Sequence, residues 1–181
     1  MTDGGRPTGS GRDGPADDFR TELLALIPHL RAFARGLCGR PDLADDLVQE
    51  TVMKAWVARD RYEAGTNMKA WTFTILRNLF LNEIRRSSRM TEMEEGAGHP
   101  DLIARPSQED AVHVTDLQSA LYRLPKDRRE ALLLVGAGGF SYEEAARICG
   151  VPAGTIKSRV ARGRAQLMVM LSDDGEPPEP A

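Results

Sequence analysis

The residues with the clearest chemical pattern lie near the C-terminal end of the 181-residue chain. Residues 155–171 contain four basic side chains and no acidic one, and their periodicity predicts one long helix. Such a face suits the major groove of DNA, where arginine contacts guanine or phosphate and hydroxyl groups contact phosphate. The candidate contacts are Thr155, Lys157, Ser158, Arg159, Arg162 and Arg164.

A shorter preceding helix must position that face. Ser141 and Glu144 have the spacing of a capping box, which predicts a helix of about two turns. Gly150 can supply the positive φ that ends this helix, and Pro152 is compatible with the start of the next one. The stretch 140–167 therefore predicts a helix-turn-helix. The longer helix should pack through its apolar and small residues Ile156, Val160, Gly163 and Leu167.

Residues 19–90 show helical periodicity as well. One apolar stripe comprises Val48, Val52, Ala55 and Trp56, and a later one comprises Phe73, Leu76, Phe80 and Ile84. Polar residues fall mainly on other faces of these helices: Asp45, Asp46, Gln49, Glu50 and Lys54 in the first, and Asn78, Asn82, Arg85 and Arg89 in the second.

The net charge of −3 hides an uneven distribution. Residues 19–90 carry 12 basic and 8 acidic side chains, and residues 120–171 carry 9 and 4. Residues 91–119 carry 7 acidic and 1 basic. Two basic segments therefore alternate with acidic segments along the chain. This pattern indicates two surfaces that are able to bind a polyanion.

The predicted fold is all-α, with two small helical bundles joined by a flexible acidic linker. We expect a disordered tail over residues 1–18, a bundle over 19–90, a linker over 91–114, a second bundle over 115–171 and an acidic tail over 172–181. No apolar run approaches the ~20 residues of a membrane span, and the N-terminus lacks the apolar stretch of a secretory signal. Two cysteines without a metal-ligand pattern favour the reducing cytoplasm, with no metal or cofactor.

Several stretches together resemble a known family. They are LIPHLRAFARGLCG, DLADDLVQETVMKAW, GTNMKAWTFTILRNLFLNEIRR and LPKDRREALLLVGAGGFSYEEAARICGVPAGTIKSRVARGRAQL. They cover about three quarters of the chain and resemble the extracytoplasmic-function (ECF) sigma factors of bacterial RNA polymerase. The likeness is strongest to the general-stress (EcfG-type) group of alphaproteobacteria. It implies a promoter-specificity subunit that is not itself an enzyme.

The resemblance also implies roles for individual residues. Docking on a coiled coil of core RNA polymerase falls to Asp45, Asp46, Gln49, Glu50 and Lys54, although a solvated face is the alternative. Capture and opening of the −10 promoter element fall to Asn67, Lys69, Trp71, Arg77, Asn78, Asn82, Arg85 and Arg86. For Trp71 core packing is an equally good interpretation, and Asn78 and Asn82 could be plain polar surface. The basic C-terminal helix would read the −35 element.

By the same resemblance, we expect an anti-sigma factor of the NepR type as a partner, besides core RNA polymerase and promoter DNA. The two bundles should pack together when the chain is inhibited and separate on polymerase. One alternative is a sigma-like decoy that binds an anti-sigma protein without reading promoters. Another is a conventional dimeric helix-turn-helix repressor, which the DLVQET-like bundle disfavours.

Other residues have simpler interpretations. We expect His29, Cys38 and Cys149 to be packing residues because their surroundings in the sequence are apolar. The glycine-rich run 136–139 lacks the lysine and hydroxyl residue of a phosphate-binding loop, so it predicts a turn between helices.

Overall fold

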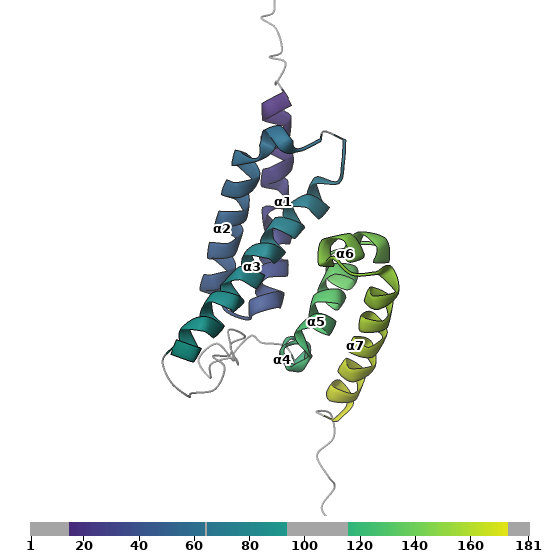
Figure 1. The fold of residues 1–181 in the computed structure, drawn as a ribbon. Helices are drawn as coiled ribbons and strands as arrows, with labels where there is room; N and C mark the ends of the chain where they lie inside the picture. Colours follow the sequence, from purple (N-terminus) through teal and green to yellow (C-terminus); the bar gives the residue numbers. More distant parts are fainter. Residues whose placement is uncertain (1–14, 64, 94–115, 174–181) are drawn as a thin grey trace, which may run out of the picture.

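The computed structural model describes residues 15–63, 65–93 and 116–173, which form helices and no strand (Figure 1). The first bundle contains α1 (Pro15–Cys38), α2 (Pro41–Val57), the 3-10 turn η1 (Arg59–Arg61) and α3 (Met68–Met93). The second contains α4 (Asp116–Arg123), α5 (Lys126–Leu132), the π-helical turn η2 (Leu133–Ala137), α6 (Tyr142–Cys149) and α7 (Ala153–Asp173). The all-α fold with two bundles is confirmed.

Three helix ends differ from the expected segment limits. Helix α1 begins at Pro15, inside the predicted tail, because a proline fits a first helical turn and Asp17 and Asp18 complement the positive end of the helix dipole. Helices α3 and α7 continue to Met93 and Asp173, past residues 90 and 171, because neither 91–93 nor 172–173 contains a glycine or a proline. The rest of the predicted linker and tails lies outside the described residues.

The local signals of the helix-turn-helix are confirmed. The hydroxyl of Ser141 accepts a hydrogen bond from the backbone N–H of Glu144 at 3.1 Å, and the Glu144 carboxylate accepts one from the Ser141 N–H at 2.9 Å. Gly150 ends α6 at φ 67°, a conformation that costs other residues about 1–2 kcal/mol. The carbonyl of Pro152 then accepts the first hydrogen bonds of α7.

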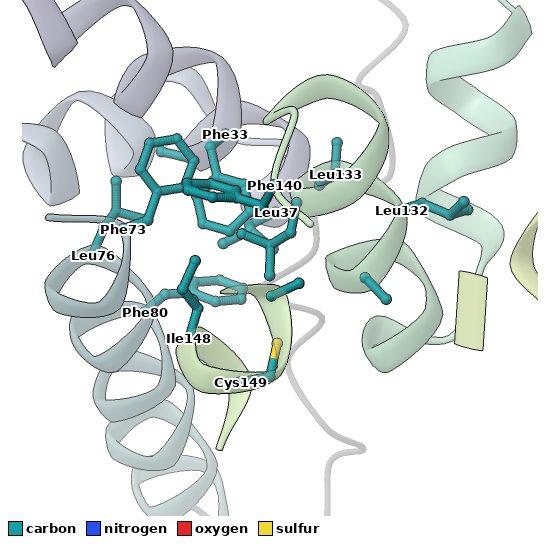
Figure 2. Packing of buried hydrophobic residues seen from close by; sticks show 14 of the residues in the cluster. Phe33, Leu37, Phe73, Leu76, Phe80, Leu132, Leu133, Phe140, Ile148 and Cys149 are labelled. Atoms are coloured by element: carbon teal, nitrogen blue, oxygen red, sulfur yellow. The ribbon is translucent and has the colours of Figure 1, made fainter. Parts of the chain in front are cut away.

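One apolar core joins the two bundles (Figure 2). Phe73 of α3 stacks on Phe33 of α1 with ring centroids 4.8 Å apart, and its edge meets Phe140 of the second bundle at 5.0 Å. Ile148 and Cys149 of α6 belong to the same cluster. The bundles therefore share buried apolar surface, which adds to the limited stability that each gains alone.

A smaller aromatic cluster lies within the first bundle. The Phe19 ring lies 6.2 Å from Trp56, 5.6 Å from Tyr62 and 6.3 Å from Trp71. Trp56 was expected in a buried stripe, but it is 39% exposed at the edge of the bundle, with the Arg59 guanidinium 5.0 Å above its ring. Its indole covers Phe19 on one side only.

The three residues expected to pack have different environments. Cys38 and Cys149 are buried free thiols, and Cys38 donates a hydrogen bond to the Ala34 carbonyl at 3.0 Å. His29 is exposed, so its assignment as a packing residue was wrong. It lies one residue before the buried Leu30 and lines, with Phe73 and Leu133, a small hollow where the two bundles meet. The glycine-rich run 136–139 lies between helices, as predicted: it supplies the last two residues of η2 and the bend that follows.

Candidate nucleic-acid and protein interfaces

Helix α7 presents most of its predicted basic face to solvent. Lys157, Arg162 and Arg164 are exposed, whereas Thr155, Ser158 and Arg159 are half-buried. The Arg159 guanidinium lies 3.2 Å from the carboxylate of Asp127 on α5, and the Ser158 hydroxyl donates to the Thr155 carbonyl at 2.9 Å. The exposed cations remain available to a phosphate or a base edge.

Close packing on α5 fixes the orientation of α7. Ile156 and Val160 are buried, and a Cβ added to Gly163 would lie only 2.8 Å from a methyl carbon of Leu132. The glycine therefore permits the approach of the two helices, despite a cost of ~1 kcal/mol relative to alanine within a helix. Arg128 also donates to Gln166 across the same contact at 2.8 Å.

The residues predicted to contact the −10 element divide into three groups. The first group is exposed on α3 and consists of Asn78, Asn82, Arg85 and Arg86. Arg86 pairs with Glu83 at 3.0 Å within the helix. Exposed pairs of this kind contribute less than about 1 kcal/mol, so the pair is easily exchanged for a phosphate contact.

The second group, Asn67, Lys69 and Arg77, contacts the second bundle. The Asn67 amide donates to the Glu144 carboxylate at 2.7 Å, and the Lys69 ammonium donates to the Gly138 carbonyl at 2.7 Å. Arg77 makes a two-point contact with Glu130 of α5, at 2.6 and 3.3 Å. Asn67 also accepts a hydrogen bond from the Ala70 N–H at 2.9 Å, which caps the start of α3.

Trp71 forms the third group. It is half-buried, and its ring lies 5.2 Å from Tyr62 and 6.3 Å from Phe19. The Tyr62 hydroxyl in turn donates to the Thr66 carbonyl at 2.6 Å, in the loop before α3. The arrangement supports packing as the main role of Trp71 and leaves part of its ring at the surface.

The residues predicted to dock on polymerase lie along α2. Asp46, Gln49, Glu50 and Lys54 are exposed, and Glu50 pairs with Lys54 at 3.1 Å. Asp45 is half-buried instead, because the Arg31 guanidinium holds its carboxylate at 2.8 Å. Asp45 therefore helps to join α1 to α2.

The same side of α2 carries two apolar residues that the sequence reasoning missed. Met53 and Val57 are 67% and 78% exposed. They follow Asp46 and Gln49 at helical spacing, i+7 and i+11 from Asp46, which is the signal that could have found them. A polar face with exposed apolar side chains is typical of a protein-binding surface.

Burial and pairing perturb several of these groups. Burial lowers the pKa of Arg77, but the hydrogen bond and charge of Glu130 outweigh it, so the net pKa is raised. Burial lowers the pKa of Lys126, whose ammonium lies 5.0 Å above the Phe80 ring. Hydrogen bonds from Ser141 lower the pKa of Glu144. Arg77 and Glu144 thus remain ionised at neutral pH.

The acceptors Glu130, Gly138 and Glu144 were also missed by the sequence reasoning. Glu130 looked like one more solvated acid, and its partner lies 53 positions away in the sequence. Within the described ranges, no group of histidine, cysteine, aspartate or glutamate side chains is arranged to hold a metal ion. Among the helices described, none has the length and apolar character that crossing a membrane requires.

Comparison with known proteins agrees with this architecture. Residues 24–90 match the family described as Sigma-70 region 2, and residues 115–167 match Sigma-70, region 4. Each match lies over one of the two bundles. Together the fold and the two matches define a sigma-70-type transcription initiation factor.

The chain is 49% identical, over 88% of its length and 88% of the relative's, to the ECF RNA polymerase sigma factor EcfG of Rhodopseudomonas palustris. It is 48% identical to the sigma factor RpoE of Bartonella quintana, solved in complex with the anti-sigma factor NepR. That likeness has a TM-score of 0.75 and covers 86% of this chain and 97% of the other. The chain belongs to the ECF RNA polymerase sigma factors.

A weaker likeness concerns the fold alone. The PhyRSL protein of Sphingomonas sp. Fr1, solved in complex with NepR, is 20% identical, with a TM-score of 0.61. It covers 89% of this chain and 94% of the other.

Proposed function

We propose that this chain is the promoter-specificity subunit of RNA polymerase for a general stress response. It binds core polymerase through α2, captures the −10 element through α3 and reads the −35 element through α7. The chemistry of transcription belongs to polymerase, so the chain acts by binding and not as an enzyme. Because RNA polymerase works in the cytoplasm, the chain acts there too.

The acid-free face of α7 is the observation that carries this proposal. Lys157, Arg162 and Arg164 are exposed on a helix that follows a capped α6 and a glycine turn. Such a second helix enters the major groove in helix-turn-helix proteins, with phosphate contacts setting its register and a few side chains reading bases.

The polymerase contact falls on the exposed polar and apolar face of α2. The residues proposed to dock are Asp45, Asp46, Gln49, Glu50 and Lys54, joined by Met53 and Val57 at the surface. Asp45 acts by positioning its neighbours, since its carboxylate is held by Arg31. Exposed methionine and valine supply apolar area that a purely charged face would lack.

The regulatory partner is an anti-sigma factor of the NepR type. The 48% identical sigma factor of Bartonella quintana was solved with NepR, and its likeness covers both bundles of this chain.

Run-off transcription tests the proposal. Purified core polymerase is supplied with a pool of promoter fragments, with and without the chain. We expect transcripts from discrete start sites only when the chain is present. Arg162→Ala with Arg164→Ala should abolish them, whereas Arg40→Ala, which removes an exposed arginine between α1 and α2, should not.

The outcomes separate this function from the decoy. A decoy would bind a NepR-type protein firmly and yield no transcript with core polymerase. Transcripts that survive the double substitution in α7 would contradict −35 reading by that helix. Absence of both transcripts and anti-sigma binding would reject the proposal altogether.

A further inference from the structure

Three side chains assigned to −10 capture are bound by the second bundle. Arg77 meets the Glu130 carboxylate, Lys69 meets the Gly138 carbonyl and Asn67 meets the Glu144 carboxylate. We call these three contacts the clasp. Each joins α3, or the residue before it, to an element at least 53 positions later in the sequence.

The acceptors of the clasp offer the same chemistry as a nucleic-acid strand. A phosphate oxygen takes hydrogen bonds from arginine and lysine as a carboxylate or carbonyl oxygen does, and a base edge takes one from an amide. One guanidinium cannot form a two-point contact with Glu130 and with a phosphate at the same time. DNA and the second bundle therefore compete for these donors.

Two of the three contacts of the clasp are partly sheltered from solvent, whereas the Asn67–Glu144 contact is exposed. The side chains of Arg77 and Glu130 are 16% and 4% exposed, so water and salt screen their attraction weakly. The Lys69 ammonium also lies 5.2 Å from the Phe140 ring, which itself packs on Phe73. Freeing the donors requires the second bundle to move away, because Phe140 and Glu130 lie on it.

The basic face of α7, in contrast, remains exposed in the same conformation. Lys157, Arg162 and Arg164 are exposed, although α7 belongs to the bundle that covers α3. Of the α7 residues named as DNA contacts, Arg159 is the one with an ion pair, to Asp127 of its own bundle. Packing of the second bundle on α3 thus engages three donors of the −10 surface, leaves Asn78, Asn82, Arg85 and Arg86 exposed, and leaves the basic face of α7 open.

We propose that the second bundle is an intramolecular competitor of the −10 strand, so that the closed chain binds a −35 duplex but not a −10 strand. The inference rests on the proposed function, since it takes Asn67, Lys69 and Arg77 as DNA contacts. Separation of the bundles then releases all three donors together.

The test measures the affinity of the full chain for two fluorescent probes without polymerase. One probe is the single-stranded −10 segment, and the other is the −35 duplex, of a promoter found in the run-off assay. In Glu130→Gln we expect the −10 strand to bind up to about tenfold more tightly, the gain from opening a closed form that holds nine-tenths of the molecules. Binding of the −35 duplex should not change, which also shows that the second bundle remains folded.

Two further variants separate masking from a general charge effect. Glu143→Gln removes the same charge from an exposed position on α6 and should leave both affinities unchanged. Phe140→Ala keeps every charge but removes the apolar contact with Phe73, and it should tighten −10 binding as Glu130→Gln does. Equal gains in Glu143→Gln and Glu130→Gln would overturn the proposal.

Failure of this inference differs from failure of the proposed function. If the wild-type chain directs transcripts but neither Glu130→Gln nor Phe140→Ala tightens −10 binding, the masking is wrong and the function stands. If the wild-type chain directs no transcripts, the function itself is rejected, and masking of promoter contacts falls with it.

Discussion

The two proposed DNA-binding surfaces differ in what surrounds them. On α7, Lys157, Arg162 and Arg164 project from a helix whose other side is buried against its own bundle. On α3, Lys69 and Arg77 point at the other bundle and are bound there. The same residue types are thus available on α7, whereas on α3 part of them is engaged. The sequence shows which residues can donate hydrogen bonds to DNA, but it does not show whether the fold leaves them exposed.

The difference follows from how each helix is buried. Helix α7 buries one stripe, Ile156 and Val160, and keeps its polar face free. Helix α3 packs on two sides, against α1 and α2 within its bundle and against α6 across the junction. A helix that packs on two sides has less polar surface left for a partner, so its donors can be regulated by movement of a neighbour.

The largest expected effect concerns the core that the bundles share. Phe73→Ala removes contacts with Phe33 and Phe140, and truncation of a buried phenylalanine costs about 3–5 kcal/mol. Tryptophan fluorescence reports the first bundle, and circular dichroism reports both. In urea we expect the unfolding transitions measured by these two signals to coincide no longer. Phe19→Ala is the control, since its cluster lies within the first bundle. Coincident transitions in Phe73→Ala would mean that the bundles are not coupled through this ring.

The next effect compares the replacement of an arginine by alanine on α7 with the same replacement on α3. Arg162→Ala should weaken binding of a −35 duplex by the free chain by about 1–3 kcal/mol, the value of a good base contact. Arg77→Ala should not weaken −10-strand binding by the free chain, because Glu130 already holds that guanidinium. Fluorescence anisotropy at fixed salt measures both. Loss of −10 binding in Arg77→Ala would show that the donor is free.

A smaller effect concerns the buried thiol of Cys149, whose reactivity reports whether the two bundles are packed together. Burial, with a further contribution from the charge of Glu130, raises the pKa of Cys149 to about 12 from its ordinary value near 9. The thiol is therefore protonated, and slow to alkylate, at pH 9. In Glu130→Gln the exposed thiol should titrate near 9, and peptide mapping should find it alkylated several-fold faster at pH 9. Equal rates in the two proteins would contradict opening by this substitution.

The smallest effect concerns the helix that contacts α3. Ser141→Ala removes the cap of α6 and should lower the free energy of unfolding by about 1 kcal/mol. Ser172→Ala, which removes a hydroxyl bonded only to the preceding turn of α7, should change it much less. Chemical denaturation of both variants measures the difference.

Local signals made much of the fold predictable from the sequence. Ser141 with Glu144, and Gly150, act within a few residues, so their spacing alone indicated where α6 begins and ends. The apolar stripe of α7 was equally readable, and the close approach at Gly163 agrees with it.

Contacts between distant segments were not predictable in this way. Arg77 and Glu130 are 53 residues apart, and each resembles an ordinary surface charge in its own segment. Trp56 fell on an apolar stripe, yet it lies at the end of α2 where too few neighbours remain to cover it. His29 likewise lies among apolar residues in the sequence, but its side chain is exposed beside the junction of the bundles.

A distance measurement across the two bundles tests directly whether they separate when core polymerase binds. Dyes on Glu22→Cys in α1 and Ser172→Cys in α7, both exposed positions, would report energy transfer in the free chain and after addition of core polymerase. We expect transfer in the free chain to change clearly when polymerase binds, as the clasp opens to release Lys69 and Arg77 for the −10 strand. Transfer that stays the same when polymerase binds would contradict this expectation.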